Sequence, residues 1–274
     1  MNTNRGSYML GAALGSALVL TLCVKAHAAD IYQAPPEPVV EAVPAPVLDR
    51  GIYIKGYIGQ ANPDVGSYTD EVIRRDGNFV GFDSAIKSSP LFGLGVGWRH
   101  SHWLRFDLTG EYRGDATFLA HDAYRNIGFG AGTNEYTADI QSWLGLANAY
   151  IDMGNWCGFT PYVGAGVGLA TLSVNGLKDV NNATNGVYYA ADHTNTNFAW
   201  AVYAGTSYDV TPQVTLDLTY RYAQLGDAKS GVASDAWGNN PPYSGVFVKD
   251  ITSNDLMLGF RYKLQRDVPV YAVK

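Results

Sequence analysis

Eight segments of the chain alternate, with a period of two, between apolar residues and polar or small residues. They cover residues 51–60, 90–99, 103–113, 138–151, 160–173, 197–209, 213–224 and 252–264. In the third segment, Leu104, Phe106 and Leu108 fall on one face, and Arg105 and Asp107 fall on the other. A period of two indicates β-strands with two unlike faces, whereas an amphipathic helix would show a period of 3.6. The sequence therefore predicts an all-β protein.

The connections between these segments alternate between long and short. The short ones are 100–102, 152–159 and 210–212, and the long ones are 61–89, 114–137, 174–196 and 225–251. Bacterial outer-membrane barrels have an even number of antiparallel strands, short periplasmic turns and long external loops. Each segment is also close to the roughly 9–11 residues that a tilted membrane strand needs. The pattern predicts an eight-stranded antiparallel up-and-down transmembrane β-barrel of the bacterial outer membrane, over residues 51–264.

The segments outside the predicted barrel have their own signatures. Residues 1–28 combine Arg5, an apolar run over residues 8–22 and the small-x-small site Ala26-His27-Ala28, which is typical of a cleaved signal peptide. The apolar run is too short for a transmembrane helix. Residues 29–50 carry five prolines and predict an extended periplasmic linker. Residues 265–274 form a predicted periplasmic C-terminal tail, because an even number of strands returns the chain to its starting side.

Alternation alone does not decide which face of the barrel points outward. A soluble carrier of apolar ligands would turn the apolar face inward. In the second and fifth segments, the face opposite the apolar residues consists mainly of glycine. Glycines inside a narrow barrel leave room for large side chains from other strands, so they favour an arrangement with the apolar face outward. Aromatic residues also gather at strand ends, like the girdle at a membrane interface. These predicted interfacial residues are Trp98, Trp103, Trp156, Tyr162 and Tyr208.

If the apolar face points outward, the charged residues of the opposite face point into the lumen. The predicted lumen charge network consists of Lys55, Arg99, Arg105, Asp107, Glu111, Arg113, Asp217, Arg221, Asp255 and Arg261. Eight strands enclose a space just wide enough for side chains to fill it. Buried charges must then pair with one another. We therefore predict that the paired lumen charges stabilise the barrel from inside, as an internal brace. The alternative is a small porin-like channel for ions or small solutes.

Composition and motifs argue against other function classes. The formal net charge of −6 disfavours a nucleic-acid partner. Two cysteines are too few for a thiolate zinc cage, and His100 and His102 have no third ligand visible in the sequence. The glycine run at 164–168 lies inside a strand and opens no helix, so it does not fit a dinucleotide site. No Ser-His-acid set is recognisable. We expect no metal, no cofactor and no catalysis.

The predicted external loops hold the best candidates for binding. Exposed aromatic residues next to arginine could meet lipopolysaccharide or a host surface, or could pack on one another, and both alternatives stay open. These candidates are Tyr68, Arg74, Arg75, Trp237 and Tyr243.

The run NAYIDMGNWCGFTPYVGAGVGLA, residues 148–170, adds a family resemblance. Its pattern of Asn-x-Tyr-x-Asp, a short turn and Pro-Tyr-x-Gly-x-Gly-x-Gly resembles the central hairpin of the outer-membrane β-barrel domain family, the opacity-like small surface proteins also called the "porin family". GIYIKGYIG, LDLTYRYAQLG and LMLGFRYKL resemble its first, seventh and last strands. The family usually ends on an aromatic residue that the barrel-assembly machinery is thought to read. Here Leu264 stands at that place and the tail follows.

Together these observations predict an integral, non-catalytic barrel of the cell outer membrane with a structural and surface-interaction role. Envelope integrity and external contact through the four long loops are its expected contributions. The expected partners are outer-membrane lipid and lipopolysaccharide, the barrel-assembly machinery during biogenesis, and an external or host ligand.

Overall fold

The structure is a computed structural model that describes residues 50–70, 79–126, 130–237 and 245–264. The predicted signal peptide, the linker up to residue 49 and the C-terminal tail lie outside the described residues. So do three of the predicted loop candidates, Arg74, Arg75 and Tyr243. The described part of the chain contains no helix long and apolar enough to cross a membrane.

The described residues form twelve strands. They are β1 (Gly51–Asp64), β2 (Ser67–Asp70), β3 (Phe79–Ile86), β4 (Ser89–Arg99), β5 (Leu104–Asn126), β6 (Gly130–Asp152), β7 (Phe159–Asn181), β8 (Val187–Ala190), β9 (His193–Asp209), β10 (Val214–Lys229), β11 (Ala233–Asp235) and β12 (Val246–Lys263). Each of the eight predicted segments lies within one long strand of this set, except that Trp103, Gln213 and Leu264 lie one residue beyond the ends of β5, β10 and β12.

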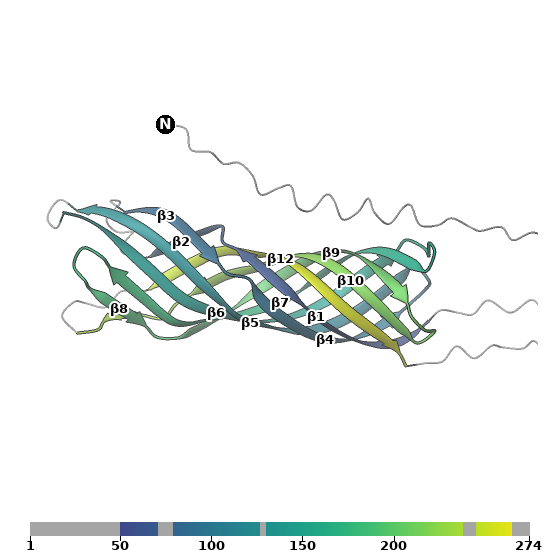
Figure 1. Cartoon of the computed structure of the whole chain (residues 1–274). Helices are drawn as coiled ribbons and strands as arrows, with labels where there is room; N and C mark the ends of the chain where they lie inside the picture. The colour runs from purple at the N-terminus through teal and green to yellow at the C-terminus, as the bar shows by residue number, and fades with distance from the viewer. Residues whose placement is uncertain (1–49, 71–78, 127–129, 238–244, 265–274) are drawn as a thin grey trace, which may run out of the picture. The chain divides into compact units, whose positions relative to one another are not determined.

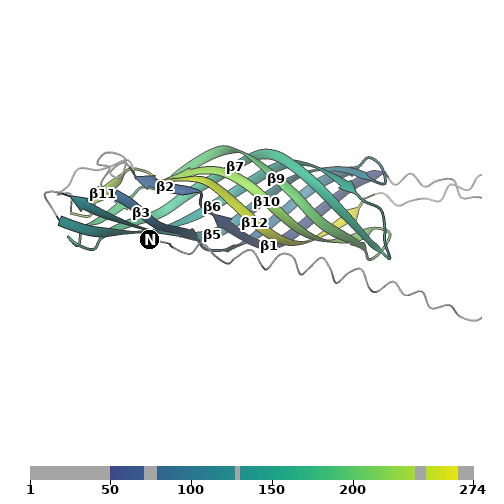
Figure 2. The ribbon, with the colours of Figure 1, turned by 90° about the horizontal axis from the view of Figure 1, so that it is seen from above.

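Eight of these strands close into a ring. The order is β1, β4, β5, β6, β7, β9, β10 and β12, and β12 pairs with β1 again. Every pairing is antiparallel, and β7–β9 contacts run from Phe159↔Tyr208 to Val174↔His193. A closed ring leaves no strand edge, which lipid requires because it offers no water to unpaired backbone groups. The four short strands β2, β3, β8 and β11 pair with β12, β5, β7 and β8, and they gather at one end of the barrel (Figures 1 and 2).

The apolar face of the ring points outward and the charged face points inward, as the sequence predicts. Leu94 and Leu108 are 73% and 67% exposed, whereas Arg105 and Arg221 are each 1% exposed. On β6 the outward positions 143, 145, 147, 149 and 151 carry only apolar or small side chains. Nine residues with a tilt of about 40° span roughly 20 Å, close to the height of the lipid-facing band of outer-membrane barrels.

The strands extend well past this band at one end, farther than the sequence predicts. The predicted long loops at 114–137 and 174–196 are largely strand: β5 runs to Asn126, β6 starts at Gly130 and β7 runs to Asn181. Bulges interrupt the alternation of β5 between Arg113 and Ala116 and that of β7 near Gly176, whose φ is +61°. A bulge inserts one residue and breaks the period of two, so the sequence pattern ends too early.

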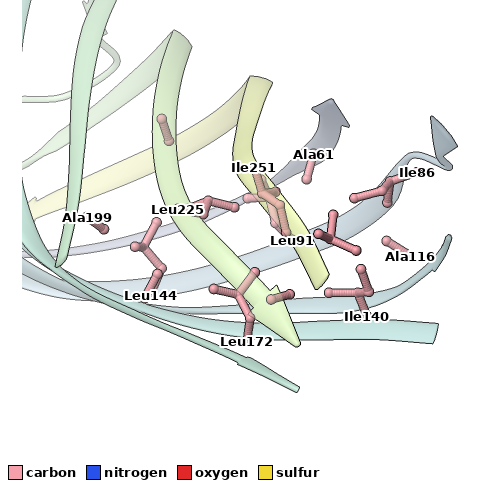
Figure 3. Packing of buried hydrophobic residues seen from close by; sticks show 14 of the residues in the cluster. Ala61, Ile86, Leu91, Ala116, Ile140, Leu144, Leu172, Ala199, Leu225 and Ile251 are labelled. Carbon is pink, nitrogen blue, oxygen red and sulfur yellow. The ribbon is translucent and has the colours of Figure 1, made fainter. Parts of the chain in front are cut away.

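Polarity inverts in this extension. On β6 the outward positions change from Trp143 to Gln141 and Asp139, while Ile140 and Tyr136 point inward and are buried. Leu91, Leu172 and Leu225 converge on the same interior from three other strands (Figure 3). The extension therefore has a polar outside and an apolar core, like a water-soluble β-protein, and it stands outside the lipid-facing band.

The position of the band can be tested on β12. Replacing Leu258, in the lipid-facing row, by Arg is expected to lower the free energy of unfolding by about 2–4 kcal/mol, because a charge then faces the bilayer midplane. Thr252→Arg, on the same outward face beyond the band, should cost at most about 1 kcal/mol. Urea unfolding in lipid vesicles measures both. Equal losses for the two variants would contradict the placement of the band.

Candidate functional site

Each of the ten residues of the predicted lumen charge network points into the barrel or lines its mouth, and each takes part in an ion pair. The side chains of Lys55 and Arg99 are 14% and 15% exposed, and the other eight are more deeply buried. The pairs are Lys55–Asp107, Arg99–Asp152, Arg105–Asp152, Arg113–Glu111, Arg113–Asp255, Arg221–Glu111, Arg221–Asp255 and Arg261–Asp217.

Four of these residues form a closed cycle of alternating charge. Arg113 binds Glu111 at 2.8 Å and Asp255 at 2.7 Å, and Arg221 binds the same two carboxylates, each at 2.7 Å. Glu111 and Arg113 come from β5, whereas Arg221 and Asp255 face each other on β10 and β12. The cycle therefore crosses the lumen. Each carboxylate is shared by two guanidinium groups, which is the arrangement that compensates buried charge best.

A second cluster lies nearer the end with the short turns. Arg261 binds Asp217 through two nitrogens, at 2.7 and 2.9 Å, and also donates to the Ser207 hydroxyl at 2.7 Å. Lys55 binds Asp107 at 3.0 Å, and Asn148 donates to the other oxygen of Asp107 at 2.7 Å. These groups fill the lower lumen with directed hydrogen bonds.

Sequence reasoning missed two kinds of lumen residue. Asp152 holds both Arg99 and Arg105, yet its position next to the turn placed it among the connection residues. The Arg105 guanidinium also lies between the rings of Tyr150 and Tyr162, 4.4 Å from each centroid. The residues on the opposite face from Tyr150 are Ala147 and Ala149, which are only weakly apolar. The two faces of the strand therefore differ little here, and the inward direction of Tyr150 is hard to predict from the sequence.

The glycine faces accommodate these tyrosines. Gly93 lies directly opposite Tyr57 on the neighbouring strand, and Gly164 lies opposite Tyr150. A Cβ at either glycine would overlap the tyrosine ring that covers it. Pairing an aromatic ring with a cross-strand glycine lets the ring lie flat against the wall of a narrow barrel.

Two small cavities lie inside the described part of the barrel. One cavity of about 20 Å³ lies among Lys55, Tyr57 and Tyr203, and a second of about 20 Å³ lies among Ile140, Leu172 and Ile251. Each has room for roughly one water molecule. Arg221 lines the first cavity and Arg113 lines the second. The charge cycle that joins these two arginines therefore stands between the cavities, and the apolar core lies beyond it.

Four of the five predicted interfacial aromatics lie on the outside, near the short turns. Trp98, Trp103, Trp156 and Tyr208 are 47%, 45%, 64% and 44% exposed. The assignment of Tyr162 is wrong: it is 3% exposed and its hydroxyl bonds the Thr219 hydroxyl in the lumen at 2.6 Å. Tyr162 shares the parity of the inward glycines Gly164 and Gly166, and that parity, not its place at a strand end, sets its direction.

A second group of aromatics at the other side of the band was not predicted. The Tyr112 and Trp143 rings lie 5.0 Å apart, and the Trp200 and Tyr222 rings lie 5.7 Å apart. Tyr112, Trp143 and Tyr222 occupy the last outward positions before the surface turns polar, and Trp200 is followed on β9 by the exposed Phe198 before the polar Thr196. They stand in the middle of long strands, so the sequence gives no strand-end signal for them. Two aromatic girdles thus border the lipid-facing band.

The described loop candidates have different surroundings. Tyr68 packs edge-on against Phe118 and Tyr136, with ring centroids 6.2 Å away in each case, and its hydroxyl donates to the His121 carbonyl. It therefore contributes to the packing at the mouth of the extension. Trp237 is 65% exposed next to β11. Within the described ranges no three His, Cys, Asp or Glu residues cluster in a way that would hold a metal ion.

Comparison with known proteins identifies the family. The model of the outer membrane protein beta-barrel domain matches residues 15–263. The chain belongs to this family. It is a protein of the outer membrane, and its eight-stranded barrel is the fold of that family.

Two relatives and one solved structure illustrate the range of similarity. An uncharacterized protein of Brucella abortus is 28% identical over 274 residues, covering 90% of this chain and 95% of its own length. A putative adhesin of Rickettsia conorii is 28% identical over 120 residues, which are 43% of this chain and 47% of the relative. The crystal structure of the outer membrane protein OprG from Pseudomonas aeruginosa has a TM-score of 0.51 at 14% identity, covering 79% of this chain and 97% of OprG. The likeness to OprG concerns the fold alone.

The charge cycle can be tested by removing one charge without changing shape. Glu111→Gln is expected to lower the free energy of unfolding by about 3–5 kcal/mol, because Arg113 and Arg221 then share a single carboxylate inside the lumen. Glu135→Gln, on the outer face of β6, is the matched control and should change it by less than about 0.5 kcal/mol. Urea titration of folded protein in vesicles gives both values. A loss no larger than the control's would show that the cycle does not brace the barrel.

Proposed function

We propose that this protein is a non-catalytic surface-interaction scaffold, which contributes to the integrity of the envelope and contacts an external or host partner through the end of its extension. The observation that carries the proposal is the rigid extension outside the lipid-facing band, with its own apolar core. Residues 130–141 of β6 alone rise roughly 30 Å along the barrel axis at about 40° of tilt. Such a length lifts the end of the barrel clear of the membrane surface.

Apolar groups exposed at that end support a contact role. Tyr189 on β8 is 53% exposed, Val232 next to β11 is 56% exposed, and Trp237 is 65% exposed. Their strands pair through Ala233↔Ala190 and Ser234↔Tyr189, so the sheet positions them on a fixed surface. Exposed apolar groups outside a membrane are often contact sites. The similarity to a putative adhesin is in keeping with this role.

The filled lumen disfavours the alternative of a small porin-like channel. The charge cycle and the apolar core lie in series along the barrel axis, and the cavities on either side hold about 20 Å³ each. A hydrated ion needs a continuous water path, which the paired charges of the cycle and the apolar core that follows both disfavour. The lumen charges are therefore interpreted as an internal brace.

For biogenesis, we propose that Tyr262 supplies the aromatic group that the assembly machinery reads. It lies on the outward face of the last strand and is 38% exposed. Leu264, which follows it on the same side, is 53% exposed.

If the lumen charges act only as an internal brace, the protein should carry no ion current across a planar bilayer. Protein extracted folded from outer membranes should give no discrete openings in a planar bilayer. Lys55→Glu should lose stability, because the new carboxylate faces Asp107, and it should create no selective current. Reproducible openings whose ion selectivity changes in Lys55→Glu would instead establish a channel.

The contact role is tested by adhesion. A non-adherent Gram-negative strain that displays the protein should bind cultured epithelial cells more than the empty strain does. The double variant Tyr189→Ser, Trp237→Ser should lose most of that gain at equal surface amount. The control is the double variant Trp156→Ser, Tyr208→Ser, which changes the same residue types at the periplasmic end. It should keep the gain in cell binding. If the display strain binds no better than the empty strain, or if both variants behave alike, the proposed surface is wrong.

A further inference from the structure

A belt of neutral polar side chains surrounds the barrel immediately above the lipid-facing band. On six of the eight long strands, the first outward residue beyond the apolar row is an amide or a hydroxyl. The six residues are Gln60, Gln141, Thr171, Thr196, Gln224 and Asn254. The other two strands carry Pro90 and Asp115 at this level. We call these six residues the amide–hydroxyl belt.

We propose that the amide–hydroxyl belt binds the sugar headgroup of the outer-leaflet glycolipid, by hydrogen bonds to sugar hydroxyls and not through the glycolipid phosphates. The belt continues an interface that is already fixed. Going away from the lipid-facing band, Gln141 is the next outward residue after Trp143 of the second aromatic girdle, and Gln224 is the next one after Tyr222. Whatever lies directly above the acyl chains of the outer leaflet must therefore cover these side chains.

The charge of the belt selects between sugar and phosphate. Phosphate groups are held by Arg and Lys, which supply positive charge and several donors. The six belt residues carry no charge, and Asp115 at the same level would repel an anion. Among the described residues around the belt, Lys87 lies nearby, since its backbone N–H bonds the Thr117 carbonyl at 2.9 Å. Amides and hydroxyls both donate and accept, which matches sugar hydroxyls.

Hydrogen bonds between strands order three of the six belt residues, Thr171, Thr196 and Asn254, before any ligand binds. The Thr171 and Thr196 hydroxyls lie 3.1 Å apart, and Ser173 and Thr194, one step farther out, lie 2.9 Å apart. The Tyr220 hydroxyl donates to the Asn254 amide oxygen at 2.6 Å, which leaves the amide nitrogen of Asn254 directed elsewhere. Fixed side chains lose less conformational entropy on binding than free ones do.

The experiment compares the thermal unfolding midpoint of the folded barrel in three kinds of vesicle. The first contains phospholipid alone, the second adds lipid A with its innermost sugars, and the third adds the same glycolipid with its phosphates removed. Loss of heat-modifiable gel mobility reports unfolding. We expect both glycolipids to raise the midpoint by roughly 3–6 °C, because the belt lies at the level of these innermost sugars. Removal of the phosphates should change this gain little.

Two variants distinguish binding of the sugar from binding of the phosphates. Gln60→Ala, Gln141→Ala, Gln224→Ala should lose the gain given by the glycolipid without phosphates, and its midpoint in phospholipid alone shows whether it still folds normally. Lys87→Ala should keep the gain.

Three results would overturn the proposal. Loss of the gain on removal of the phosphates would assign the effect to phosphate. Loss of the gain in Lys87→Ala would assign it to phosphate. Retention of the gain in the triple variant, or in Gln60→Ala alone should the triple variant not fold, would assign it to another surface. None of these outcomes bears on adhesion to cells, so this inference and the proposed function can fail separately.

Discussion

Closure of the strands in a medium without water is the constraint on which the rest of this structure depends. Every backbone donor and acceptor within lipid must find a partner in the chain, and an antiparallel ring satisfies them all. Eight strands make that ring narrow. A narrow ring with an apolar exterior must place its polar alternate residues in a small enclosed space, so the charges there have to pair. The alternating cycle of Glu111, Arg113, Asp255 and Arg221 follows from this geometry.

The enclosed charges and the apolar core divide the interior into two regimes. At the level of the lipid, the exterior is apolar and the interior is polar, and beyond the second aromatic girdle the assignment is reversed. The long strands β5, β6, β7, β10 and β12 pass through both regimes, whereas β4 begins at Ser89 and β3 takes its place beside β5 in the extension. The reversal is a response to solvent: lipid surrounds one part of each strand and water surrounds the other, and each part buries what its own surroundings exclude. The extension is therefore a continuation of the barrel wall and not a set of separate loops.

Most of the membrane part could be predicted from the sequence. A period of two, with connections that alternate in length, is enough to give strand number, pairing order and facing, and the charged residues on the inward face follow from parity. The failures have physical causes. Tyr162 stands at a strand end, where position suggested an interface, but its parity turns it inward. Asp152 stands next to a turn, so its role emerges only when Arg99 and Arg105 are brought to it in space. The extension was missed because bulges break the alternation and because membrane strands were expected to be short.

The bulges themselves have a consequence for how such a protein can change over time. They lie near the level at which polarity reverses: in β5 after Arg113, in β7 at Gly176, and in β10 and β12 around Gly226 and Asp250. A strand without a bulge transmits any one-residue insertion along its whole length and turns every following side chain to the opposite face. A bulge at the boundary absorbs such a change. The outer part of the wall can then gain or lose single residues during evolution while the part embedded in lipid keeps its facing, which frees the exposed end to diverge under selection from outside the cell.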